Sequence, residues 1–168
     1  MTVYTFILII LAIFLVWRVY KRVQKMMASQ RSIMSRHYTG VGVFGGMVLV
    51  ALSETLNQPV IMTALLAATG IGIGWGVYAL QKTRFNEQTV FYTPPANIGM
   101  VIAMLFFARL MQLGMEYYIS QGPGTVAPAF TDSPVTMAAV GLFGGYFGTY
   151  SAGLMRWRMA LRRKIMRG

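Results

Sequence analysis

Apolar residues gather in five long stretches along the chain, with short polar segments between them. The stretches cover residues of about 3–20, 40–56, 60–80, 97–119 and 134–155. A helix of about 20 apolar residues crosses the hydrocarbon core of a bilayer. The pattern therefore predicts an all-α polytopic membrane protein, a bundle of five transmembrane helices that forms one domain over residues 1–168.

Polar residues also predict how the spans begin and end. The second and third stretches are separated only by Asn57, Gln58 and Pro59. Because proline does not continue a helix, we predict a tight helical hairpin at this point. The first stretch has no basic residue before it and no small-residue cleavage site after it, so we expect a permanent anchor rather than a signal peptide.

The basic residues predict the orientation of the spans. Every Lys and Arg except Arg109 falls in residues 18–39, 81–95 or 156–168. Basic loops face the cytoplasm, so we expect the N-terminus outside and the C-terminus inside. The net charge of +11 is then mainly a topology signal, and we expect a multi-pass protein of the plasma membrane, the inner membrane in a Gram-negative cell.

The tail has basic residues beside an apolar helical stripe. It predicts a helix end in contact with anionic lipid headgroups, or alternatively a docking helix for a cytoplasmic partner. No nucleic-acid-binding motif accompanies the charge. In the segment 81–95, Asn86 and Glu87 predict the turn of a small hairpin. The candidate headgroup or partner contacts are Arg156, Arg158, Arg162, Arg163 and Lys164.

Composition narrows the possible chemistry. Hydrophobic residues make up 56% and charged residues 11%, which is too few charges for the surface of a soluble domain. The chain has no cysteine and one histidine, His37, which leaves no thiol chemistry and little for a metal site. We therefore expect no metal, no cofactor and no catalytic residues. Met111 and Met115 have a spacing that can hold Cu(I), but methionine is more often a packing residue.

One basic residue lies inside a predicted span. Arg109 is about 18 Å into the fourth stretch, at 1.5 Å per residue, and intramembrane charges normally find a partner. Arg109, Gln112 and Glu116 share one helix face, and Glu54 is a second acid at similar depth. We expect Arg109 and Glu116 to be too far apart for a direct pair unless Gln112 or water bridges them. Arg109 would then bond to carbonyls, to Tyr146 or Tyr150, or to an anion. Both a structural lock and an anion or proton site remain open.

Glycine pairs spaced four apart occur in the third and fifth spans, and such pairs let helices approach closely in lipid. We expect them to pack spans two, three and five, and the alternatives are a homodimer face or a cavity lining. The candidate packing residues are Gly70, Gly74, Gly141, Gly145, Gly144 and Gly148.

Part of the chain resembles a family of small bacterial multi-pass proteins, the CcdC-like group. The resemblance covers Gly74 to Arg109 and rests on Lys82-Thr83-Arg84-Phe85, on Tyr92-Thr93-Pro94, and on Arg109 followed by Leu110. It implies a link to cytochrome c maturation. A chain without cysteine cannot itself pass thiol electrons or hold haem covalently.

These observations favour a non-catalytic accessory, assembly or interaction subunit over an enzyme. Such a subunit would be a homo-oligomer or bind another membrane protein. The alternative is a small transporter or channel for an anion, a proton or a small solute, with Arg109, Gln112, Glu116 and Glu54 along its path.

Overall fold

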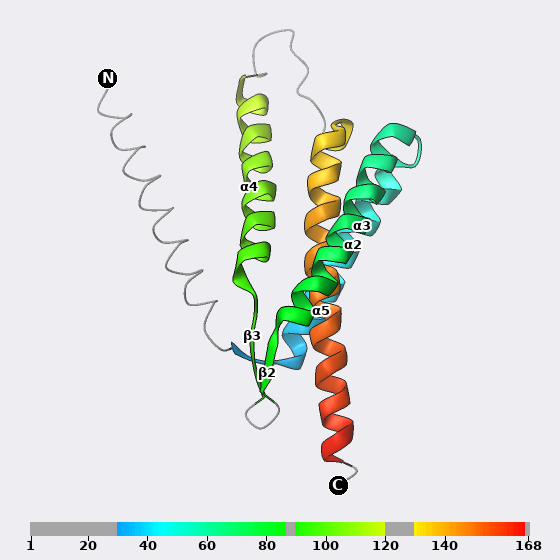
Figure 1. Ribbon diagram of the computed structural model, residues 1–168. Coiled ribbons are helices and arrows are strands. Elements are labelled where there is room, and N and C mark those ends of the chain that lie inside the picture. Colours follow the sequence, from blue (N-terminus) through cyan, green and yellow to red (C-terminus); the bar gives the residue numbers. More distant parts are fainter. Residues whose placement is uncertain (1–29, 87–89, 120–129, 167–168) are drawn as a thin grey trace, which may run out of the picture.

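The computed structural model describes residues 30–86, 90–119 and 130–166, which form four long helices and a small sheet (Figure 1). The predicted first span and most of the loop at 120–133 lie outside the described residues. Three helices, Met34–Thr55, Pro59–Lys82 and the Asn97–Tyr118 part of the third, are long and apolar enough to cross a membrane. The described fold is thus that of an all-α membrane protein. The helices are α2 (Met34–Thr55), α3 (Pro59–Lys82), α4 (Ala96–Ile119) and α5 (Pro134–Ile165).

The predicted hairpin between the second and third spans is confirmed. Helix α2 ends at Thr55 and α3 begins at Pro59, and the backbone N–H of Gln58 donates to the carbonyl of Thr55 at 2.9 Å. Proline suits the first position of a helix because its missing N–H has no partner there in any case. At its other end, α2 begins at Met34 rather than near Gly40, so its first turns are polar.

Helix α5 is the centre of the bundle and contacts α2, α3 and α4. Helices α3 and α5 run in the same direction and make the most extensive contact (Figure 1). A Cβ on Gly72 would lie 2.5 Å from the carbonyl oxygen of Leu142, and one on Gly145 would lie 2.5 Å from that of Thr69. The two backbones therefore touch, which only glycine permits.

Helix α4 joins the bundle through aromatic side chains. The rings of Phe106 on α4 and Phe143 on α5 are stacked with centroids 4.3 Å apart. Tyr146 of α5 is buried and packs against Gly99, where a Cβ would lie 3.2 Å from its hydroxyl oxygen. These contacts hold α4 to α5, and most other α4 side chains are exposed, as lipid-facing residues of a membrane helix would be.

A three-stranded antiparallel sheet lies at one end of the bundle, in the order β1 (Gln30–Arg31), β3 (Phe91–Thr93), β2 (Arg84–Asn86). The hairpin predicted around Asn86 is confirmed as β2 and β3, with Phe85 paired to Tyr92, while Glu87 lies outside the described residues. Strand β1 was not predicted, because two residues carry no alternating pattern. A buried hydrogen bond of 2.9 Å between Ser32 Oγ and His37 Nε2 ties β1 to α2.

Candidate functional site

Arg109 lies on α4 with its side chain only 12% exposed, and each of its guanidinium nitrogens has a partner. Nε donates to Thr136 Oγ1 at 3.0 Å, Nη2 donates to Ser133 Oγ at 3.2 Å, and Nη1 is 3.2 Å from Glu116 Oε1. One side chain of α4 thus holds two residues of the first turn of α5. The partners are two hydroxyls and one carboxylate, so the positive charge is both hydrogen-bonded and neutralised.

The direct pair between Arg109 and Glu116 contradicts the sequence prediction. Seven residues rise about 10 Å along a helix, which suggested that a third group was needed. The glutamate side chain leans toward the N-terminus of α4, as helical side chains do. The guanidinium extends the other way, toward the start of α5, so the two groups meet. Gln112 joins them, since its Nε2 donates to the same Glu116 oxygen at 3.0 Å.

The start of α5 supplies two hydroxyl groups that accept hydrogen bonds from Arg109. Ser133 is the N-cap of α5, its hydroxyl accepts from the backbone N–H of Thr136 at 3.4 Å, and Pro134 follows at the first helical position. Thr136 is 1% exposed. A helix N-terminus repels a cation because its N–H dipoles point outward. The carboxylate of Glu116 offsets this repulsion, which explains why arginine and glutamate occur together here.

Glu54 does not join this cluster. It is exposed near the end of α2 and makes no hydrogen bond or ion pair with another described residue. The cluster therefore contains Arg109, Gln112 and Glu116 but not the second acid. The predicted bond of Arg109 to a tyrosine is wrong: Tyr146 packs on Gly99, and the hydroxyl of Tyr150 lies 3.0 Å from Thr83 Oγ1.

Sequence reasoning missed Ser133 and Thr136. The signal was present, since Ser followed by Pro and then Thr is typical of a helix start. It marks a cap, however, and does not reveal that a side chain from another helix shares the capping hydroxyl.

The candidate packing glycines fall into two groups. Gly141 and Gly145 meet the backbone of α3 at Leu65 and Thr69, Gly144 meets Val48 on α2, and Gly148 lies in ordinary contact with Phe44. On α3, however, the glycines in contact with α5 are Gly72 and Gly76.

Gly70 and Gly74, the predicted packing pair of α3, do not contact α5. Gly70 and Gly74 are exposed, and a Cβ on either would meet nothing within 4 Å. They lie on the far side of α3 because two residues turn a helix by about 200°. The packing of α3 in this bundle therefore uses the neighbouring pair.

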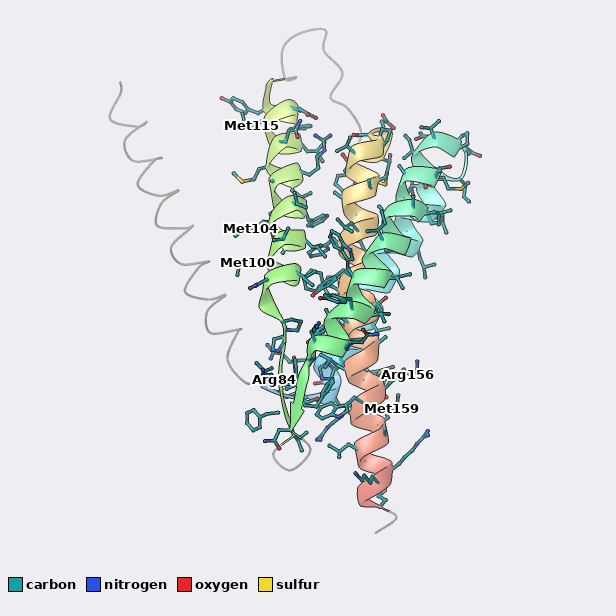
Figure 2. The ribbon with its side chains drawn as sticks, in the orientation of Figure 1. Arg84, Met100, Met104, Met115, Arg156 and Met159 are labelled. Atoms are coloured by element: carbon teal, nitrogen blue, oxygen red, sulfur yellow. The ribbon has the colours of Figure 1, made fainter. Side chains whose placement is uncertain are left out.

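Apart from Arg109, the basic residues that the structure describes lie at the opposite end from its three carboxylates. The candidate contacts Arg156, Arg158, Arg162, Arg163 and Lys164 lie in the last part of α5, near the sheet (Figure 2). All but the half-buried Arg158 are exposed. Trp157 packs on Phe85 of β2 with ring centroids 4.6 Å apart and the rings tilted by 35°, which holds the tail helix to the sheet.

No group of three His, Asp or Glu that could hold a metal ion occurs among the described residues. The methionines Met104, Met111 and Met115 lie along α4 and are more than half exposed. Figure 2 shows Met104 and Met115 on α4, well apart from the basic end. Their exposure is expected for residues that meet lipid.

Comparison with known proteins finds no matching family model, no matching curated protein and no matching solved structure. The class of the protein is therefore defined by its own fold, an all-α bundle with three helices suited to cross a membrane.

Proposed function

We propose that this protein is a non-catalytic integral membrane protein that acts as an accessory, assembly or interaction subunit by binding a second membrane protein through the exposed face of α3. The partner is another copy of the chain or a different polytopic protein. The proposal includes five spans in the plasma membrane, with the N-terminus outside and the C-terminus in the cytoplasm.

The observation that carries the proposal is the contrast between the two glycine pairs of α3. Gly72 and Gly76 are closed by the backbone of α5, whereas Gly70 and Gly74, with the same spacing, face outward with nothing within 4 Å. In lipid, a small-xxx-small pair favours close approach of another helix. Ile71, which follows Gly70 on α3, is also about half exposed.

The polar cluster of α4 supports a binding role over transport. All three nitrogens of Arg109 donate to groups of the same chain, and the guanidinium is largely enclosed. An arginine that binds a passing anion needs a donor open to a wet path. This geometry favours a structural role in which Arg109 joins α4 to α5. It leaves no evident reacting group in the described core.

The charge distribution supports the orientation. Except for Arg109, the described basic residues lie at the end with the sheet, and Glu54, Glu116 and Asp132 lie on the segments at the other end (Figure 1). The positive-inside rule then puts the sheet and the tail in the cytoplasm. The resemblance to the CcdC-like group remains a prediction from the sequence.

Site-specific photo-crosslinking in the native membrane tests the proposed face. A photoreactive residue at Ile71 should give one crosslinked product of defined mass, whereas the same residue at Leu105, which is equally exposed on α4, should give none. The double variant Gly70→Leu/Gly74→Leu should remove the product while the bundle remains folded. A lone monomer in mild detergent, without any crosslink at Ile71, would contradict the proposal.

A further inference from the structure

A groove runs along one flank of α2, beginning at the end of the helix that adjoins the sheet. It has a volume of about 410 Å³ and is lined by Ser35, Arg36, Thr39, Gly40, Val43 and Phe44. Its lining changes character along its length, since the hydroxyls and the guanidinium come first and the apolar side chains follow.

The polar half of the groove has donors to spare. Arg36 is exposed and makes no ion pair or hydrogen bond with another described residue. The hydroxyl of Ser35 is likewise without a hydrogen bond in the part of the chain described, whereas Thr39 Oγ1 already donates to the carbonyl of Ser35 at 3.0 Å and is not a free donor. The ligand that suits this half is an anion, because a guanidinium and a hydroxyl both donate to phosphate oxygens.

Charges around the groove strengthen this preference. The first turn of α2 has no acidic residue and no side-chain cap. Among the described residues, the three carboxylates are on the segments at the other end of the bundle, so nothing described there neutralises Arg36.

The apolar half of the groove is rigid and open to lipid. Phe44 is fixed between Phe143 and Phe147 of α5, with ring centroids 5.5 and 5.3 Å away. Because residue 40 is glycine, α5 packs directly against α2 and forms the floor of the groove; a Cβ on Gly40 would lie 2.6 Å from Ser151 Oγ. Val43 is 58% exposed and forms the outer wall.

The groove is long enough for a phosphate and the first part of an acyl chain. Ser35 to Phe44 spans about 13 Å of helix, and the apolar part from Gly40 to Phe44 spans about 6 Å of it. A molecule with an anionic phosphate at one end and the start of an acyl chain at the other fits both halves at once.

We infer that this groove is a binding site for a single anionic phospholipid, with its phosphate on Arg36 and Ser35 and an acyl chain along Val43 and Phe44. The site is distinct from general attraction of the basic tail to headgroups, because it needs one arginine and one apolar surface. It is also independent of the partner proposal, which concerns residues of α3.

Native mass spectrometry of the detergent-purified protein tests the site with phosphatidylglycerol and phosphatidylethanolamine as probes. The wild-type chain should retain one phosphatidylglycerol in preference to phosphatidylethanolamine. Arg36→Gln should weaken that binding about tenfold or more, as loss of a charge-assisted hydrogen bond does. The matched control Arg162→Gln removes the same charge from the exposed tail and should leave binding unchanged.

Two further experiments distinguish a bound lipid from free phosphate or a second copy of the chain. Val43→Trp fills the apolar half without changing charge and should also weaken phosphatidylglycerol binding, whereas excess inorganic phosphate should not displace the lipid. Equal loss in Arg36→Gln and Arg162→Gln, displacement by phosphate, or no preference between the two lipids would each overturn the inference. A dimer that Val43→Trp dissociates would assign the groove to a second copy instead. Thermal unfolding of each variant verifies that it is folded. If Val43→Trp does not fold, Arg36→Gln and Arg162→Gln still test the site, because both arginines are exposed and neither change should disturb the fold.

Discussion

Gly72 of α3 and Leu142 of α5 bring two parallel helices into backbone contact. A Cβ on Gly72 would lie 2.5 Å from the carbonyl oxygen of Leu142 and 2.9 Å from the backbone nitrogen of Tyr146. Backbone atoms cannot rotate away as a flexible side chain can, so a methyl group here must separate the helices.

Gly72→Ala should therefore lower the free energy of unfolding by about 1–3 kcal/mol, the usual range for overpacking. Gly70→Ala is the matched control, since it lies two residues away on the same helix and meets nothing within 4 Å. Detergent-based equilibrium unfolding of the two variants measures the difference. Helix propensity favours alanine over glycine at both positions, so Gly70→Ala should be neutral or slightly stabilising. Equal loss in both variants would show that the α3–α5 contact is not responsible.

Arg109→Gln should destabilise the bundle by about 1–2 kcal/mol, since it removes two hydrogen bonds between α4 and α5, which contribute about 0.6 and at most about 1.7 kcal/mol each, and the pair with Glu116 within α4. Arg109→Lys should not restore stability, because one ammonium cannot replace three donors in a fixed plane. Thermal unfolding of both variants checks this. Full stability in Arg109→Lys would mean that only the charge matters.

The pairing of Arg109 with Glu116 predicts coupling between the two positions. Single changes, Arg109→Met and Glu116→Gln, each leave the other group with one partner fewer, and the double variant removes both. We expect a coupling free energy of about 1 kcal/mol in a double-mutant cycle. Because Glu116 is 37% exposed, solvent screening keeps this value small. Strict additivity would argue that the pair contributes nothing.

The contact of Ser32 with His37 predicts how the sheet is held to α2. Ser32→Ala leaves the buried imidazole without this partner and should cost about 1–2 kcal/mol. Ser53→Ala, on the exposed side of α2, is the control and should change little. Protease sensitivity of the 84–93 hairpin reports the local loss, and an unchanged cleavage rate would contradict the assignment.

The absence of cysteine makes the proposed orientation simple to test. A membrane-impermeant maleimide should label Asp132→Cys from outside intact cells, and Arg163→Cys only after permeabilisation. Both residues are exposed, so access within the protein is equal. Labelling of both from one side would refute five spans with opposite ends.

The long apolar stretches were sufficient to predict α2 to α5 and the turn at Pro59, because hydrophobic length and proline are strong local signals. They could not predict which glycines meet α5. Gly70/Gly74 and Gly72/Gly76 have the same spacing, and only the direction in which α3 faces distinguishes them. Arg109 was found because a charge in an apolar run is conspicuous. Its partners were not, since Ser133 and Thr136 belong to another helix and the arginine points against the usual lean of helical side chains.

The position of α5 in the chain has a consequence for biogenesis. Helices α2 and α3 touch each other much less than either touches α5, yet α5 is translated after all of them. At about 5–20 residues per second, the ribosome needs roughly 4–17 s to go from Lys82 to Ile165. During that interval α5 does not yet cover the surface of α3 around Gly72 and Gly76. We therefore expect a nascent chain that stalls before residue 134 to be degraded by membrane quality-control proteases.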